Sequence, residues 1–172
     1  TDIVAASTAG GAGRVMLARS DRPFEVSELP DLLAGAVEGP LALLDVDRDG
    51  DLDLVRTRTG AEFPADAVEY RPTLWLNRGD GSFTSADSHW LGEISISTGA
   101  VAVADFDQDG RDDIFLGSRG LPGRYPEAGR SVWLLNQGDR FAEAEAGFAP
   151  TSAATAMVTA AWAGDLDDDG WV

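Results

Sequence analysis

Short apolar segments recur along the chain, separated by clusters of Gly, Asp, Asn and Pro. Segments rich in small apolar residues lie at 41–44, 100–104 and 157–163, and the first two are followed by an acidic turn and a second apolar segment. Partial alternation over so few residues is typical of strands with buried faces, not of helices. The pattern therefore predicts an all-β fold in which the small-residue strands occupy crowded positions.

A second recurring element is an apolar strand followed by a tight turn and an aromatic residue. Thr73–Asn77 precedes a Gly-Asp-Gly turn and Phe83, and Val132–Asn136 precedes a Gly-Asp turn and Phe141. This order predicts β-hairpins. A weaker version runs from residues 14–17 to Phe24 without the turn glycine. Trp75 and Trp133 are assigned equivalent positions in these strands, which predicts that both belong to the core.

The acidic turns form an internal repeat. Residues 45–53 read DVDRDGDLD, residues 105–113 read DFDQDGRDD and residues 165–172 read DLDDDGWV, so successive turns start 60 residues apart (105 − 45 and 165 − 105). Approximate repeat units are 1–53, 54–113 and 114–172. Each unit offers about four strands, which is the content of one β-propeller blade.

The spacing within the turn indicates a metal loop. Asp at positions 1, 3 and 5 gathers carboxylates, Gly at position 6 permits a sharp reversal, and position 7 can offer its backbone carbonyl. Oxygen ligands without His or Cys suit Ca²⁺ better than Zn²⁺ or copper, and a flexible loop suits it better than Mg²⁺. An EF-hand would need Glu at position 12, where Arg56 and Leu116 stand. The closing acid comes instead at position 9, so the loop should join two strands.

Charge and composition narrow the function classes. The chain has 172 residues, 44% of them hydrophobic, no cysteine and a formal charge of −17. Even with three Ca²⁺ ions the charge would be −11, which argues against nucleic acid or an anionic membrane surface as partner. No apolar run approaches the ~20 residues of a membrane span. Calcium loops of modest affinity fill where calcium is millimolar, which favours an extracellular, cell-surface or periplasmic location.

The loops and the hairpins LNRGDGSF and LLNQGDRF together resemble the FG-GAP/VCBS repeats of integrin-α-like β-propellers. The segment GSRGLPGRYPE is similar to bacterial secreted proteins that carry such repeats beside an ASPIC/UnbV-type segment. The resemblance implies blades of about four antiparallel strands, usually in a ring of about seven, with one Ca²⁺ per motif-bearing blade. About three blades would be present here.

The resemblance also implies the metal ligands, which are the side chains at positions 1, 3, 5 and 9 and the carbonyl at position 7. The third loop lacks its ninth position, so a weaker site is expected there, and Asp2 matches the ninth position of a further loop. The implied set is Asp45, Asp47, Asp49, Asp53 and the Asp51 carbonyl; Asp105, Asp107, Asp109, Asp113 and the Arg111 carbonyl; and Asp165, Asp167, Asp169 and the Trp171 carbonyl.

Three blades do not close a ring, since propellers have roughly 4–8. Either the chain is part of a larger ring, or copies complete one another, with the Asp165–Asp169 loop sharing an ion with Asp2 of the next copy. The expected role is binding, adhesion or scaffolding towards an unknown protein or glycan, without enzymatic activity. Two alternatives remain: the propeller part of an extracellular enzyme of the polysaccharide lyase or phospholipase type, or a lectin that uses Trp90 or Trp162. A core position is the preferred interpretation of both tryptophans.

Three local features receive modest interpretations. Arg78-Gly79-Asp80 spells an adhesion tripeptide, but it falls where the hairpin needs its turn, so turn chemistry is preferred. His89, the only histidine, has no second ligand-like neighbour and is interpreted as a loop residue. Residues 142–156 are rich in Ala and Glu and could form a helical turn, although the other units show no counterpart.

Overall fold

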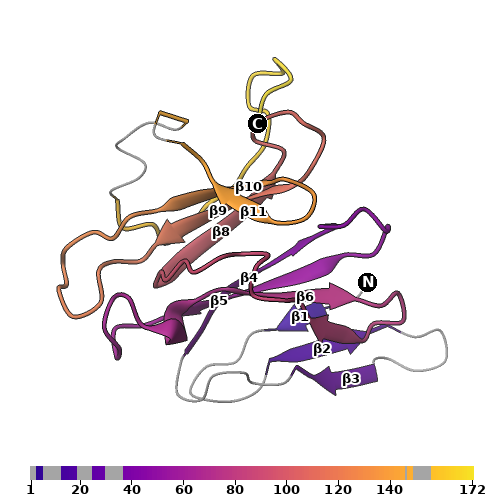
Figure 1. The fold of residues 1–172 in the computed structure, drawn as a ribbon, viewed down its shortest axis with the longest axis horizontal. Coiled ribbons are helices and arrows are strands. Elements are labelled where there is room, and N and C mark those ends of the chain that lie inside the picture. The colour runs from indigo at the N-terminus through magenta and orange to yellow at the C-terminus, as the bar shows by residue number, and fades with distance from the viewer. Residues whose placement is uncertain (1–2, 6–12, 19–24, 30–36, 146, 149–155) are drawn as a thin grey trace.

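The computed structural model describes residues 3–5, 13–18, 25–29, 37–145, 147–148 and 156–172, which form three antiparallel sheets (Figure 1). The first sheet contains β1 (Ile3–Ala5), β2 (Arg14–Leu17) and β3 (Glu25–Glu28). The second contains β4 (Val37–Leu44), β5 (Asp53–Thr59), β6 (Thr73–Asn77) and β7 (Phe83–Ser85). The third contains β8 (Thr98–Ala104), β9 (Asp113–Ser118), β10 (Val132–Asn136) and β11 (Phe141–Glu143). The predicted all-β fold is confirmed, and the sheets are consistent with propeller blades.

Strand order within the two four-stranded sheets follows the chain, so each sheet is an antiparallel meander. The acidic turns join β4 to β5 and β8 to β9, with Leu44 opposite Asp53 and Ala104 opposite Asp113. The predicted hairpins are the β6–β7 and β10–β11 pairs. Because each repeat unit was counted from the end of an acidic loop, the unit 54–113 takes most of its strands from the second sheet and β8 from the third.

The small-residue strands β4 and β8 are in contact with each other across the second and third sheets, as their composition predicts. Residues 157–163, expected to be a third such strand, form no strand. A strand requires a ladder partner, and the backbone bond found there is a single one from Val158 N to Ser118 O at 2.7 Å. The helical turn considered for 142–156 is not found in the described residues of that segment, where β11 ends at Glu143. The one helical element described is the 3₁₀ turn η1 (Val68–Tyr70).

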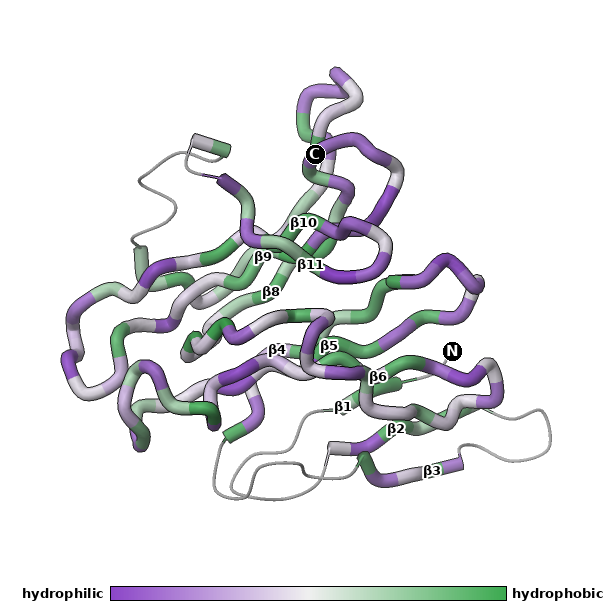
Figure 2. The backbone as a smooth tube through the Cα atoms, viewed as in Figure 1, coloured by the Kyte–Doolittle hydropathy of each residue, from purple (hydrophilic) through white to green (hydrophobic). Residues whose placement is uncertain are grey.

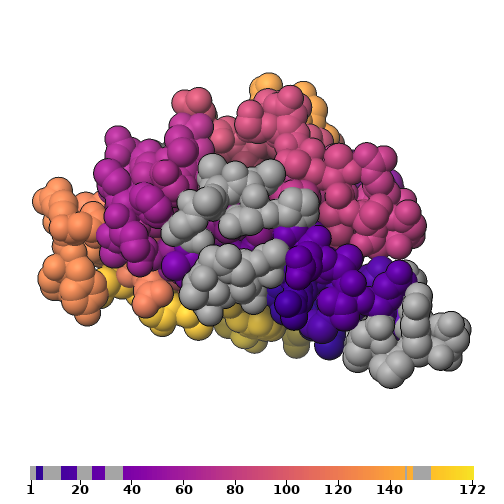
Figure 3. Space-filling model, turned by 90° about the horizontal axis from the view of Figure 1, so that it is seen from below, coloured from indigo at the N-terminus to yellow at the C-terminus, as the bar shows by residue number. Residues whose placement is uncertain are grey.

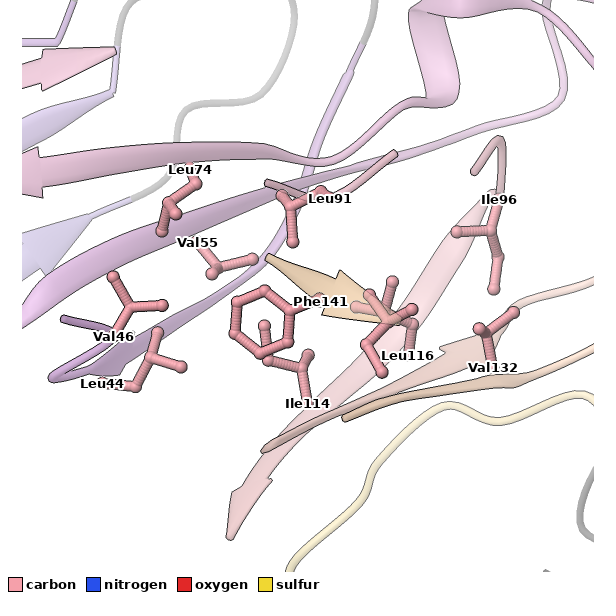
Figure 4. Packing of buried hydrophobic residues seen from close by; sticks show 11 residues of the cluster. Leu44, Val46, Val55, Leu74, Leu91, Ile96, Ile114, Leu116, Val132 and Phe141 are labelled. Carbon is pink, nitrogen blue, oxygen red and sulfur yellow. The ribbon is translucent and has the colours of Figure 1, made fainter. Parts of the chain in front are cut away.

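Each neighbouring pair of sheets encloses an apolar cluster (Figure 2). Val15, Leu29, Leu54 and Trp75 pack between the first and second sheets. The larger cluster lies between the second and third sheets, where the ring of Phe141 projects towards Val55 and Leu44 (Figure 4). Its members are Leu44, Val46, Val55, Leu74, Leu91, Ile96, Ile114, Leu116, Val132, Leu134 and Phe141. Burial on both faces explains the mostly apolar sequence of β6, TLWLN, and the Leu54-Val55 pair of β5, whereas the later residues of β5 are buried but polar.

The assumed equivalence of Trp75 and Trp133 is wrong by one residue. Trp75 pairs with Leu54, whereas the residue that pairs with the equivalent Ile114 is Leu134. Because side chains alternate between faces, a shift of one position reverses the face. Trp75 is buried against the first sheet, while Trp133 is half-buried on the far face of the third sheet, with its ring centroid 4.5 Å from that of Phe115.

The first sheet lies at the surface, with β3 fully exposed (Figure 3). Phe24, which was expected to end its hairpin, and Asp2 lie outside the described residues. This sheet has no described counterpart of β4 or β8, the strand that precedes the acidic loop in the other two sheets.

A buried ion cluster crosses the end of β5 that lies away from the acidic loop. Glu38 is only 6% exposed, and Arg56 and Arg58 are each 1% exposed. The Arg56 Nε donates to Glu38 Oε1 at 2.8 Å, the Arg56 Nη2 also reaches this oxygen, and the Arg58 Nη1 lies 3.8 Å from it. The Arg56 guanidinium additionally lies 5.5 Å from the centre of the Trp75 ring. Both buried cations therefore share the Glu38 carboxylate as a partner.

Removing the charge of Glu38 should destabilise the fold strongly. Glu38→Gln removes the carboxylate charge that both buried guanidinium groups approach, and breaking a buried pair in this way costs about 3–5 kcal/mol. Urea denaturation monitored by circular dichroism measures this loss. The matched control is Glu28→Gln, because Glu28 pairs with Arg14 at the surface and an exposed pair contributes roughly 0–1 kcal/mol. Equal effects of the two variants would contradict the interpretation.

Candidate metal centre

The structure gathers aspartate oxygens into three clusters, one at each acidic loop. Within a cluster the oxygens lie no more than 4.8 Å apart. The two complete loops contribute positions 1, 3 and 9, and the third contributes positions 1, 3 and 5. The clusters are Asp45, Asp47 and Asp53; Asp105, Asp107 and Asp113; and Asp165, Asp167 and Asp169.

The position 9 aspartates anchor each complete loop to its sheet. Asp53 opens β5, where its carboxylate accepts hydrogen bonds from Val46 N at 3.0 Å and Asn77 N at 2.8 Å. Asp113 opens β9 and accepts equivalent bonds from Phe106 N at 2.9 Å and Asn136 N at 2.8 Å. One carboxylate thus connects its own loop to the neighbouring hairpin strand.

Position 1 fixes the reversal of the chain. The Asp45 Oδ2 accepts from Gly50 N at 3.1 Å, and Asp105 Oδ2 accepts from Gly110 N at 2.8 Å. These glycines have φ angles of +93° and +82°, in the region that side chains with a Cβ rarely adopt. The same bond, from Gly170 N to Asp165 Oδ2 at 2.8 Å, shapes the third loop. The glycine at position 6 is therefore required by the turn itself.

Position 5 differs from the predicted ligand arrangement in the complete loops. Asp49 and Asp109 do not join their clusters; instead each accepts from the position 7 amide, at 2.9 Å in the first loop and 2.8 Å in the second. Asp109 also pairs with the Arg111 guanidinium at 2.5 Å. The carbonyls of Asp51, Arg111 and Trp171 remain predicted ligands.

One further acid lies close to two loops at once. Asp112, at position 8 of the second loop, has its pKa raised by burial and by the charges of Asp105 and Asp45, and lowered by Arg48. Sequence reasoning counted Asp112 only towards the net charge. Position 8 is the apolar Leu52 in the first loop but an acid, Asp112, in the second, and this difference is the signal in the sequence that could have identified Asp112.

Burial and crowding make the complete loops electrostatically unfavourable without a cation. Burial, followed by repulsion from Asp107, raises the pKa of Asp113 to about 6, and burial with repulsion from Asp47 and Asp49 raises that of Asp53. In the exposed third loop, hydrogen bonding from Gly170 N lowers the pKa of Asp165. The first loop also contains a buried carboxylate oxygen, Asp45 Oδ1, without a hydrogen-bond partner.

The residues present fit a calcium ion. Asp45 carries a buried carboxylate oxygen without a partner and offers an oxygen within 4.8 Å of oxygens of Asp47 and Asp53, so a cation there would satisfy an acceptor. All the gathered donors are hard oxygens, and the described chain places no histidine in a cluster, which is the ligand chemistry of Ca²⁺.

The Arg78-Gly79-Asp80 tripeptide and His89 have local contacts that agree with their interpretation as a turn and as a loop residue. In the Arg78-Gly79-Asp80 turn, Gly79 N donates to Asn77 Oδ1 and Ser82 N donates to Asp80 Oδ1. His89 pairs with Asp87 at the exposed surface, with Nδ1 and Oδ1 3.1 Å apart. Trp90 packs against the large apolar cluster, as preferred, whereas Trp162 is 74% exposed, so the core position preferred for it is wrong.

Asp113 should make the calcium-free protein less stable as the pH rises. Its folded pKa of about 6 exceeds the ordinary value of 3.8, so the folded state binds the proton more tightly and loses stability between these values as the group ionises. Melting temperatures in calcium-free buffer at pH 5 and pH 7 measure this slope. Asp113→Asn should reduce the slope, and the exposed Asp139→Asn should not. An identical slope in both variants would contradict the assignment.

Comparison with known families supports the loop assignment. Residues 64–116 match a family model described as an FG-GAP-like repeat, a segment that runs from the β5–β6 connection through the second acidic loop into β9. A comparison with curated proteins found no match. The aspartate clusters are of the kind typical of calcium sites in such repeats. Residues 64–116 of this chain are an FG-GAP-like repeat.

Proposed function

We propose that this chain is a calcium-stabilised β-propeller segment of a secreted or cell-surface protein, acting in binding or adhesion or as a scaffold. The observation that carries the proposal is the buried Asp45 Oδ1, which has no hydrogen-bond partner within a group of crowded carboxylates. An ion at this place would satisfy the oxygen and neutralise the repulsion together. It would thereby join the strands on the two sides of the loop.

In each complete loop the carboxylates at positions 1, 3 and 9 would hold the ion. Position 5 and the carbonyl of position 7 would complete the oxygen set after a local adjustment of the loop. In the third loop, Asp165, Asp167 and Asp169 would form a weaker site, since all three are exposed. The calcium itself supplies positive charge and coordination; the strands supply the rigid positions.

The expected setting is extracellular or periplasmic, because FG-GAP-like repeats are typical of extracellular proteins. No helix among the described residues is long and apolar enough to cross a membrane. The expected partner is a protein or glycan, since a net charge of −17 disfavours nucleic acid. We propose repeat units of about 1–53, 54–113 and 114–172, with the ring completed by further blades of the same protein or by other copies.

Calcium should raise the melting temperature. When the free Ca²⁺ concentration is a hundred times the Kd of a site, binding adds about 2.7 kcal/mol to the free energy of unfolding. In a domain of this size each kcal/mol raises the melting temperature by roughly 2–4 °C. Differential scanning calorimetry with Ca²⁺, with Mg²⁺ and with a chelator measures the shift, which should be larger for Ca²⁺ than for Mg²⁺.

Two variants test whether the loops cause this shift. Asp45→Asn weakens the first cluster and should remove part of the calcium-dependent rise. Asp66→Asn changes an exposed aspartate in the β5–β6 connection and should leave the rise intact. Melting that ignores calcium in the unmodified chain would rule out the proposal.

A cleft between the second and third sheets favours the lectin alternative as a second candidate function. This cavity of about 360 Å³ lies at the opposite end of the strands from the acidic loops and is lined by Thr59, Glu62, Ser97, Arg119 and Tyr125 among others. The Thr59 hydroxyl is buried without a hydrogen-bond partner, and Tyr125 is 82% exposed. A hydroxylated ring such as a sugar could bond to the hydroxyl and stack on the aromatic face.

Glycan binding should depend on Tyr125 if this cleft is used. Binding to a glycan array in saturating calcium is expected to be lost in Tyr125→Ala, because the stacking surface is removed. Trp162→Ala removes another exposed aromatic side chain, outside the cleft, and serves as the matched control. Loss of binding in the control alone, or no binding by the unmodified protein, would exclude a sugar site in the cleft.

A further inference from the structure

The same side-chain contact joins each acidic loop to the next. The Arg48 Nη2 in the first loop donates a hydrogen bond to Gly110 O in the second, and Gln108 Nε2 in the second donates to Gly170 O in the third at 2.8 Å. Both bonds run from position 4 to position 6 and span 62 residues of sequence. A contact that repeats at one register belongs to the architecture of the loops.

Backbone geometry supports the link at both ends. Arg48 and Gln108 have φ angles of +65° and +60°, a conformation uncommon for residues with a side chain. At the acceptor end, a Cβ added to Gly110 would lie 3.3 Å from Arg48 Nη2, tighter than an ordinary contact. The residue at position 4 thus directs its side-chain donor towards the next loop, and the glycine at position 6 of that loop leaves room for the donor.

A second bond ties the first two loops together from the hairpin side. Asn136, which is 3% exposed, donates from its backbone N to Asp113 Oδ1 at 2.8 Å and from its side-chain Nδ2 to Val46 O at 3.3 Å. Asp113 closes the second loop, and Val46 belongs to the first. One buried residue therefore holds both loops.

We propose that Arg48 and Gln108 couple neighbouring calcium loops, so that occupancy of one loop raises the affinity of the next. This inference depends on the proposed calcium function. Arg48 lies between Asp47 and Asp49, so ordering these carboxylates around an ion also orders the donor. The bond to Gly110 O then fixes the Gly110–Arg111 peptide, directly before the Arg111 carbonyl that is the predicted position 7 ligand.

If Arg48 acted only through its charge, its removal would tighten calcium binding, whereas coupling predicts weaker binding at the later sites. The two accounts can therefore be distinguished by experiment. The Arg48 guanidinium interacts with Asp112, which itself faces Asp45 and Asp105. As a cation near the loops, Arg48 opposes the entry of calcium, so its removal would tighten binding if charge were its whole effect. Coupling predicts instead that its removal lowers cooperativity. Gln108 is neutral and tests the link without a change of charge.

The experiment is a calcium titration of the full chain by isothermal calorimetry, with Arg48→Met, Gln108→Met and the control Arg124→Met. Arg124 pairs with Glu127 in the β9–β10 connection, at the opposite end of the strands, and its loss matches the charge change. The unmodified chain and the control should bind with a Hill coefficient above 1. Each of the two test variants should lower it, and the affinity of the later sites should fall roughly fivefold.

A crossed variant separates coupling from damage to a single loop. Asp47→Asn, which weakens the first loop, should also weaken calcium binding by the second loop when Arg48 is present, and should not do so in the Arg48→Met background. Calcium binding with a Hill coefficient of 1 in the unmodified chain would overturn the coupling and leave the calcium function standing. Absence of any calcium binding would overturn both.

Discussion

The burial and mutual repulsion of aspartates held within 4.8 Å of one another are the constraint on which this end of the molecule depends. Backbone amides donate to several of these oxygens, but burial outweighs these bonds in its effect on the pKa of Asp113, and the nearby Asp107 adds a smaller contribution. The raised pKa of about 6 means that, without a cation, the folded state binds the Asp113 proton more tightly than the unfolded chain does. Positive charge beside these oxygens would stabilise such a turn.

A second constraint comes from sheets that are buried on both faces. All residues of β5 are buried because the first sheet covers one face and the third sheet covers the other. The far face of the third sheet, with Phe115 and Trp133, instead shares a cavity with the exposed Trp162 and Leu166. This face of the third sheet is apolar, as is the face of the second sheet that carries Leu74 and Val55. There, however, the neighbouring third sheet covers the apolar side chains.

The sequence could predict the strands, the turns and the clusters, because the fixed spacing of loops and hairpins repeats a local rule. It could not predict features that depend on pairing across the fold. Trp133 lies three residues before Asn136, whereas Trp75 lies two before Asn77, and strand pairing shows that this one-residue offset reverses the face of Trp133. The buried ion pair between Glu38 and Arg56 likewise becomes visible only once β4 pairs with β5.

The links between loops follow from a choice at position 4 that metal binding alone does not demand. Glycine would adopt the left-handed conformation there more easily, yet Arg48, Gln108 and Asp168 occupy it, with φ between +59° and +65°. Arg and Gln are hydrogen-bond donors that reach the next loop, whereas an ionised Asp168 can only accept. A loop placed after the third would therefore need to donate to Asp168.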